Sequence, residues 1–388
     1  MRRLLATYLA IATGLAGGLA LSGCYTVTGG VDAMSAVPRD EVGLPVLGLY
    51  WKRLVSDHGR EPKPQEFASP AVGQGIGEDE RLYVGSHDGT FYALQARTGR
   101  VMWKNKLGSV SSRPVVQLGR LYVGTDDGFM LCLDALDGKV LWKYATRGPI
   151  LESPVLAEDS IYFSNENDHV YALDLATGKF RWQYKSETPD EYTLRGHAGV
   201  AFGNGLVFTG FSNGNVVALR AATGSVAWMS SLKGDADRFV DVDGTPVLDG
   251  ESLYVSSSSG GVYALDQETG LIRWRLPISN AGGLVVDGNR IYVAAAEQGI
   301  YALDLQGNVI WRQGTRGGGE PAAPQVSGNY LLYSLADAGL YVADKRTGVV
   351  QQYFQPGDGV SSEPTLDGDN LYVLSNGGTL YAMSLDRF

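Results

Sequence analysis

The chain is poor in the residues and motifs on which many enzymes depend. Its 388 residues include 2 cysteines and 4 histidines. The histidines are His58, His87, His169 and His197. They lack the short spacing of metal ligands, so we expect them at solvated loop positions. The sequence has no G-x-S-x-G, P-loop or H-E-x-x-H motif, and the stretch from Asp241 to Gly244 lacks the further alternating ligands of a calcium loop. We therefore expect no catalytic site, metal or cofactor.

Positive charge is also scarce. The 32 Lys and Arg residues face 42 Asp and Glu residues, for a formal net charge of −10. Arg2 and Arg3 lie in an N-terminal segment that we expect to be removed, which leaves 30 basic against 42 acidic residues, or −12. An acidic surface argues against nucleic acid or anionic lipid as a partner.

The first 24 residues differ in kind from the rest. Arg2 and Arg3 precede an apolar run, residues 4–21, which ends in Leu21-Ser22-Gly23-Cys24. This pattern is typical of a secretory signal with a lipoprotein cleavage box. Cys24 is then the first mature residue and carries the lipid on its thiol and amine. An uncleaved membrane anchor of ~18 residues is the alternative, but the small residues before Cys24 favour processing.

Two or three acyl chains would anchor the mature protein stably. Because Tyr25 rather than Asp follows the lipidated cysteine, the lipoprotein sorting rule of Gram-negative bacteria indicates the periplasmic face of the outer membrane. We expect a signal peptide over residues 1–23, a lipidated flexible tether over 24–45 and a folded domain over 46–388. Only Cys132 then keeps a thiol, so no disulfide can form within the mature chain. Most other repeats have Ala at its position, so we expect a small buried residue.

The folded domain is built from repeats. Each copy contains an apolar tripeptide around Tyr, a Gly-containing turn, a second apolar tripeptide, another turn and a Trp strand. The copies begin at Leu82, Leu121, Ile161, Leu206, Leu253, Ile291, Leu332 and Leu371. A period of about 40 residues with alternating apolar positions is typical of four-stranded propeller blades. The pattern predicts an all-β, eight-bladed β-propeller that is monomeric, with Pro114, Pro154, Pro246 and Pro364 near the start of first strands.

The tryptophans mark the fourth strand of each blade. They are Trp51, Trp103, Trp142, Trp182, Trp228, Trp274 and Trp311. We interpret them as packing residues. The last copy ends after its third strand, whereas Trp51 lies in a strand with no blade before it, so this N-terminal strand should complete blade eight and close the ring. The seventh copy has Gln352 in place of Trp.

Two neighbouring copies are longer than the others. Successive intervals between tryptophans, from Trp103 to Trp311, are 39, 40, 46, 46 and 37 residues. The surplus falls in 185–197 and 229–243, between the last strand of one blade and the first strand of the next. Such connections emerge on one face of a propeller, so the two insertions should form one patch. Its candidate partner-binding residues are Tyr192, Leu194, Arg195, Arg238, Asp241 and Asp243, with Phe239 beside them. Arg195 could pair with either of the two Asp residues. An ordinary pair of long loops is the alternative.

Three motifs give the chain a family resemblance. Thr193-Leu194-Arg195-Gly196, the stretch from Asp237 to Pro246, and Val286 to Tyr292 resemble the BamB family, lipoprotein propellers of the outer-membrane β-barrel assembly (Bam) complex. The resemblance implies a non-catalytic scaffold that binds a POTRA domain of BamA and assists the folding and insertion of outer-membrane proteins, possible partners in their unfolded state. It assigns Leu194, Arg195, Asp241 and Asp243 to the BamA-binding surface, with Tyr192 where the family tends to have an aliphatic residue.

Two other functions stay open at this stage. The repeat also resembles quinoprotein dehydrogenases, which hold pyrroloquinoline quinone and calcium in the funnel of a propeller. Those enzymes usually carry an adjacent cysteine pair, which this chain lacks. A general cell-envelope scaffold is the remaining alternative.

Overall fold

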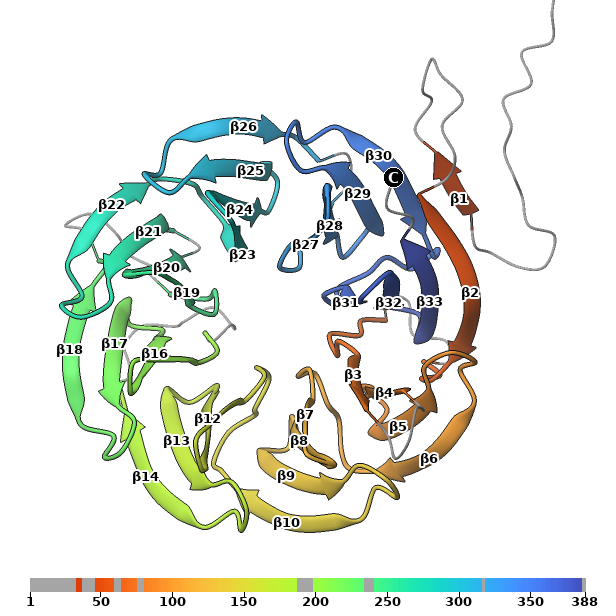
Figure 1. Cartoon of the computed structure of the whole chain (residues 1–388), viewed down its shortest axis with the longest axis horizontal. Coiled ribbons are helices and arrows are strands. Elements are labelled where there is room, and N and C mark those ends of the chain that lie inside the picture. The colour runs from red at the N-terminus through yellow and green to blue at the C-terminus, as the bar shows by residue number, and fades with distance from the viewer. Residues whose placement is uncertain are drawn as a thin grey trace, which may run out of the picture.

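The computed structural model describes residues 33–36, 46–58, 64–74, 80–186, 198–233, 241–257, 259–315 and 318–385. Within these residues, 33 strands form eight antiparallel sheets and there is no helix. The sheets are arranged as blades around a central axis (Figure 1). The predicted eight-bladed β-propeller is confirmed.

In blades one to seven the four blade strands run outward from the axis in chain order (Figure 1). Blades one to four consist of β3 (Ala71–Gln74), β4 (Glu80–Val84), β5 (Thr90–Gln95), β6 (Val101–Lys106); β7 (Val115–Gln117), β8 (Arg120–Gly124), β9 (Phe129–Asp134), β10 (Val140–Ala145); β11 (Val155–Ala157), β12 (Ser160–Asn165), β13 (His169–Asp174), β14 (Phe180–Lys185); and β15 (Ala201–Gly203), β16 (Leu206–Gly210), β17 (Asn215–Arg220), β18 (Val226–Ser231). Blades five to seven consist of β19 (Val247–Asp249), β20 (Ser252–Ser257), β21 (Gly261–Asp266), β22 (Ile272–Leu276); β23 (Ala281–Asp287), β24 (Arg290–Ala295), β25 (Gly299–Asp304), β26 (Val309–Gln313); and β27 (Gln325–Ser327), β28 (Tyr330–Ser334), β29 (Leu340–Asp344), β30 (Val350–Gln355).

Blade eight is assembled from both ends of the chain. It contains β31 (Thr365–Asp367), β32 (Asn370–Leu374), β33 (Thr379–Leu385) and, as its outer strand, β2 (Leu47–Leu54). Trp51 of β2 lies opposite Ala382 of β33. The predicted closure of the ring by the Trp51 strand is therefore confirmed.

Each tryptophan fastens its blade to the next one. The Trp182 indole N–H donates to the Ala221 carbonyl at 2.7 Å, across the boundary between blades three and four. The ring also covers Gly224, where a Cβ would lie 2.6 Å from the indole and where φ is +71°, so both space and backbone favour glycine. All seven tryptophans make this bond, at 2.7 to 3.3 Å, to Ala96, Ala135, Leu175, Ala221, Gln267, Leu305 and Lys345. The packing interpretation is confirmed, with a directional inter-blade bond added.

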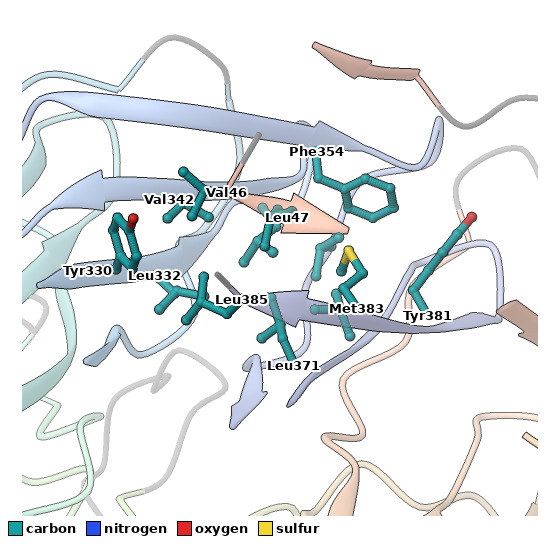
Figure 2. Packing of buried hydrophobic residues seen from close by; sticks show 13 residues of the cluster. Val46, Leu47, Tyr330, Leu332, Val342, Phe354, Leu371, Tyr381, Met383 and Leu385 are labelled. Carbon is teal, nitrogen blue, oxygen red and sulfur yellow. The ribbon is translucent and has the colours of Figure 1, made fainter. Parts of the chain in front are cut away.

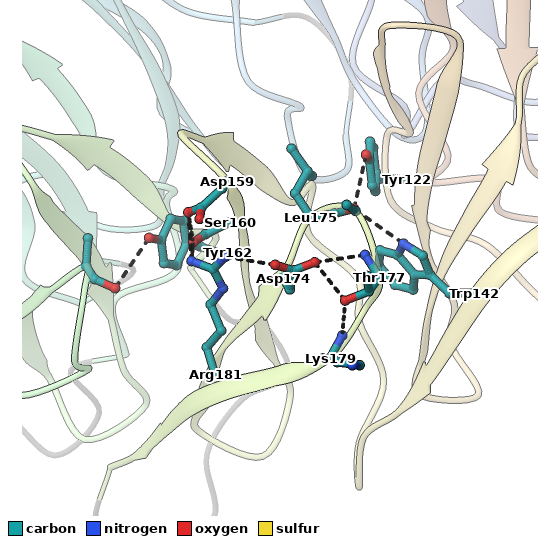
Figure 3. Close-up of polar contacts among 12 residues, drawn as sticks. Tyr122, Trp142, Asp159, Ser160, Tyr162, Asp174, Leu175, Thr177, Lys179 and Arg181 are labelled. Carbon is teal, nitrogen blue, oxygen red and sulfur yellow. Dashed lines mark hydrogen bonds and ion pairs between the residues drawn. The ribbon is translucent and has the colours of Figure 1, made fainter.

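A tyrosine on the second strand reinforces several of these bonds. The Tyr122 hydroxyl donates to the Leu175 carbonyl at 3.4 Å, and the Trp142 indole donates to the same oxygen at 3.3 Å. Figure 3 shows the two donors meeting at this one acceptor. A carbonyl oxygen has two lone pairs, so it can accept both bonds. The contact between adjacent blades thus depends on a backbone carbonyl in the turn between the third and fourth strands of the next blade.

The boundary between blades seven and eight has a different bond, which explains why the seventh copy lacks tryptophan. The outer strand of blade eight arrives from the N-terminal side, so no turn joins β33 to β2. Leu385, which corresponds to Ala221 of blade four, pairs here with Leu47 of β2. Gln352 instead accepts hydrogen bonds from the backbone N–H groups of Val46 and Leu47, at 2.7 and 2.8 Å. Around them Leu47, Phe354 and Leu385 pack in one buried cluster (Figure 2).

Gln352→Leu should lower the free energy of unfolding by about 2–4 kcal/mol, because it leaves two buried N–H groups without their acceptor. Gln351→Leu is the matched control, since this neighbour is only half-buried. Urea unfolding followed by tryptophan fluorescence measures both variants. Equal midpoints for the two would show that the amide oxygen of Gln352 does not hold the closing strand.

Polar networks hold the turns between third and fourth strands. Asp174 accepts hydrogen bonds from the Thr177 hydroxyl at 2.7 Å and from Arg181 at 2.9 Å, and Arg181 also reaches Asp159 at 2.7 Å (Figure 3). These hydrogen bonds, that of Thr177 first, lower the pKa of Asp174 to about 2. In blade five, Arg273 and then Thr269 likewise lower the pKa of Asp266 to about 2.

These two carboxylates should make stability fall in acid. Their pKa is lower in the folded state than the ordinary value of about 4, so their contribution is present above pH ~4 and is lost as the pH falls toward 2. The effect is modest because the pairs are partly solvated. In the double variant Arg181→Gln, Arg273→Gln, the drop in melting temperature between pH 5 and pH 3 should be smaller than in the parent. An unchanged drop would assign the acid sensitivity to other groups.

The strand register corrects the repeat boundaries in two copies. Val207 pairs with Leu219, and Leu331 pairs with Ala343, as Leu121 pairs with Leu133 in blade two. Leu206 and Leu332, predicted to begin these copies, are therefore each one residue out of phase. The cause is that neither second strand has the landmark tyrosine in the middle of its tripeptide, since Phe208 and Leu332 stand where Tyr122 stands in blade two.

Two smaller predictions agree with the structure. Pro114, Pro154, Pro246 and Pro364 each stand directly before a first strand. Cys132 is fully buried on β9, and burial raises the pKa of its thiol to about 11. The thiol is therefore protonated at neutral pH, as expected of a packing residue.

Candidate partner-binding site

The two long connections lie where the sequence placed them, between β14 and β15 and between β18 and β19. Residues 187–197 and 234–240 are outside the described part of the chain. Tyr192, Leu194, Arg195 and Arg238, with Phe239, fall in these two ranges, so their positions stay predictions. The ends of both connections are described.

A hydrogen bond joins the two connections. The backbone N–H of Gly199, just after the first insertion, donates to the Thr245 hydroxyl at 3.1 Å. That hydroxyl donates in turn to Glu152, on the connection that enters blade three, at 3.3 Å. Three consecutive connections therefore meet at one place, just after the two insertions end. That the inserted residues themselves form one patch stays a prediction.

The ends of the second insertion are held by the core of blade four. Val242 is 1% exposed and lies against Gly210, and its N–H donates to the Phe211 carbonyl at 3.3 Å. On the other side, Leu232 is 3% exposed and donates to the Gly214 carbonyl at 2.9 Å. Both ends of this insertion are consequently fixed to one rigid blade.

Asp241 and Asp243 occupy different environments. Asp241 is 2% exposed, whereas Asp243 is half-buried and reaches the surface. A buried carboxylate supports the connection that carries it, while an accessible one can contact a partner directly. The two Asp residues of the motif are thus suited to separate roles, a distinction that their spacing did not indicate.

Asp168 also shapes this surface, and sequence reasoning missed it. Its carboxylate is 3% exposed and accepts hydrogen bonds from the N–H and the hydroxyl of Ser212. Its carbonyl accepts the N–H of Ser186, the residue before the first undescribed range, at 2.9 Å. The sequence does offer a signal, because Asp168 stands where blade two has Gly128. Both residues take the left-handed turn conformation, with φ +57° at Asp168.

A third long connection, between β2 and β3, lies on the same face at the opposite side of the ring. In the sequence, this connection is indicated by the interval of 52 residues between Trp51 and Trp103, longer than any other interval between tryptophans. In it, His58 pairs with Glu66 at 2.9 Å, and their side chains are 8% and 1% exposed. His58 also stacks on His87, with ring centroids 6.5 Å apart. Burial raises the pKa of Glu66.

This arrangement corrects the prediction that His58 is solvated. The long connection folds back onto blades one and eight, and Glu66 accepts the His87 backbone N–H at 2.9 Å. His87 itself is exposed. Among the described residues, no group of three or more His, Cys, Asp or Glu side chains is placed to hold a metal ion. In the same part of the chain no helix is long and apolar enough to span a membrane.

Eight blades, seven of them with a tryptophan on the outer strand, define a quinoprotein-like β-propeller. The sequence matches the family of outer membrane protein assembly factor BamB over residues 50–128, 87–307 and 296–387. The chain therefore belongs to this family. No curated protein matches the sequence at a significant level.

Solved structures share the fold. BamB from Moraxella catarrhalis superimposes with a TM-score of 0.73 at 20% identity, over 87% of this chain and 100% of that one. The quinohemoprotein alcohol dehydrogenase from Comamonas testosteroni gives 0.70 at 15% identity, over 88% of this chain and 76% of that one. A computationally designed protein, Ika8, gives 0.67 at 16%, over 83% and 98%. A fold common to an assembly factor, an enzyme and a design does not by itself assign function.

Proposed function

We propose that the protein is a non-catalytic, lipid-anchored scaffold of outer-membrane β-barrel assembly that binds a POTRA domain of BamA. Family membership supports the assembly role. The observation that carries the partner site is the bond between Gly199 and Thr245, which brings the two long connections together on one face. Loops that the propeller does not need, rooted on rigid blades, are suited to recognising a protein.

The proposed surface has a base that the rigid blades hold in place. The carboxylate of Asp168 and the apolar side chain of Val242 hold its base, and Asp243 lies at its accessible edge. Arg195 supplies a side chain of a type enriched at the energetic centres of protein interfaces, and Leu194 adds apolar contact area beside it. Cys24 holds the propeller at the periplasmic face of the outer membrane, where it helps unfolded barrel proteins to fold and insert.

The structural likeness to quinoprotein dehydrogenases supports a second candidate, a propeller that binds pyrroloquinoline quinone with calcium. One preparation tests both functions. Lipidated protein purified from detergent-solubilised membranes should copurify with BamA, as identified by mass spectrometry, and should contain neither quinone absorbance nor stoichiometric calcium. Calcium and quinone without BamA would overturn the scaffold in favour of the enzyme. Copurification with other envelope proteins alone would favour a general scaffold.

A further inference from the structure

The outer edge of blade seven carries a fifth strand. β1 (Ala33–Ala36) pairs antiparallel with β30, with Ala33 opposite Gln355 and Ala36 opposite Gln352. Figure 1 shows β1 outside the ring, next to β30. No other described sheet has more than four strands. Blade seven therefore differs from the rest at its outer edge as well as in lacking tryptophan.

The amino-acid sequence of β30 lacks the charged residues that commonly protect a free strand edge. Free edges are commonly protected by charged side chains, above all Lys. Lys or Arg occurs on the outer strands of six blades, at Lys52, Arg53, Lys104, Lys106, Lys143, Arg181, Lys185, Arg273, Arg275 and Arg312. β30, with the sequence VQQYFQ, has none. β18 also lacks them, but among the described strands it pairs only with β17.

The loss of positive charge from β30 is clearest at the position that follows the tryptophan in the other outer strands. In blades five and six this residue is Arg275 or Arg312, whose guanidinium lies over the ring of a third-strand tyrosine at 5.3 or 5.2 Å. In blade seven it is Tyr353, whose ring packs on that of Tyr341 with centroids 4.6 Å apart. An apolar contact thus replaces a cation on the one edge that β1 covers.

The course of the chain brings the N-terminal segment to this edge. Gln352 of β30 binds the backbone of Val46 and Leu47, so the chain enters the ring at blade seven. Residues 37–45 are all that separates Ala36 from this point. β30 therefore makes two contacts with the N-terminal part of the chain. The side chain of Gln352 binds the start of the closing strand β2, and the outer edge of β30 pairs with β1.

We propose that the outer edge of blade seven is a docking site for residues 33–36, and that it sets where the membrane tether leaves the propeller. This inference rests on the proposed lipidation of Cys24. From Cys24 to Ala33 an extended chain spans roughly 30 Å, against roughly 75 Å from Cys24 to Val46. Docking thus cuts the reach of the tether by more than half. The tether then leaves across the ring from blade four and the partner-binding connections (Figure 1).

The docking is tested in the full mature chain with Cys24→Ser, without lipid or BamA. Ala33→Cys with Gln355→Cys places two thiols directly opposite each other in the register, close enough for a disulfide after small shifts. Mild oxidation should cross-link most molecules, as measured by mass spectrometry. The matched control is Ala33→Cys with Ala145→Cys, since Ala145 is exposed at the same place on the outer strand of blade two. Equal yields from both pairs, or no cross-link from either, would overturn the proposal.

A second measurement avoids cysteines. Deleting residues 33–36 should speed hydrogen exchange at the outer amides of β30 at least about tenfold, and should leave exchange in β26 unchanged. Slow exchange in β30 after the deletion would contradict docking. Because neither experiment involves BamA, the docking and the proposed function can fail independently.

Discussion

Trp51→Ala is expected to lower the free energy of unfolding by about 3 kcal/mol, toward the lower end of the range for large aromatic-to-alanine changes because Trp51 is only half-buried. The indole N–H bond to the Ala96 carbonyl at 2.9 Å and the packing on Gly99 would both be lost. Trp51 also packs on Tyr372 of blade eight, with ring centroids 6.4 Å apart, so its loss loosens the strand that closes the ring. Urea unfolding measures the change.

The control for this prediction is Leu54→Ala on the same strand. Leu54 is 59% exposed, so its truncation should change stability by less than about 0.5 kcal/mol. Limited proteolysis gives a second readout, because loosening of β2 should expose the N-terminal strand to cleavage before the blades unfold. If the two variants unfold at the same urea concentration, the closing role assigned to Trp51 is wrong.

The second large effect is expected in partner binding. Arg195→Ala should weaken binding to a purified POTRA fragment of BamA by about 10- to 100-fold, the range typical of a truncated interface arginine. Asp243→Ala should give a similar direction of change, because Asp243 is accessible. Isothermal titration or surface plasmon resonance measures both variants.

Asp241→Ala needs a different interpretation, because Asp241 is 2% exposed. We expect it to weaken binding and to lower the melting temperature together, and to lower the melting temperature more than Asp243→Ala does, because Asp243 is only half-buried. Arg100→Ala serves as the control, since Arg100 is an exposed arginine on the opposite face. Unchanged affinity in the Arg195 and Asp243 variants would remove the proposed site from the two connections.

Local patterns predicted the fold well because each blade is specified by nearby residues. Alternating apolar residues and Gly turns determine strands within one copy, and the unfinished last copy indicates that Trp51 closes the ring. The same reasoning misplaced Leu206 and Leu332, because Phe208 and Leu332 stand at the position where the other copies have the landmark tyrosine. It also placed His58 in solvent, because burial of His58 depends on a connection that folds over other blades.

The candidate site was predicted as a pair of insertions but not as a set of roles. Spacing alone suggested that Asp241 and Asp243 belong to one surface. Their separation into a buried support and an accessible carboxylate depends on Val242, which anchors the connection between them. The contribution of Asp168 was hidden for the same reason, since its partner Ser212 lies in the next blade.

The sequence by itself determined the number of blades, the closing strand and the position of the long connections, because periodicity and turn residues act over short stretches of chain. Only the tertiary structure decided why Gln352 replaces a tryptophan, which carbonyl each indole binds and how Gly199 meets Thr245. These are contacts between residues far apart in the sequence, and a single chain pattern does not encode which distant groups will lie side by side.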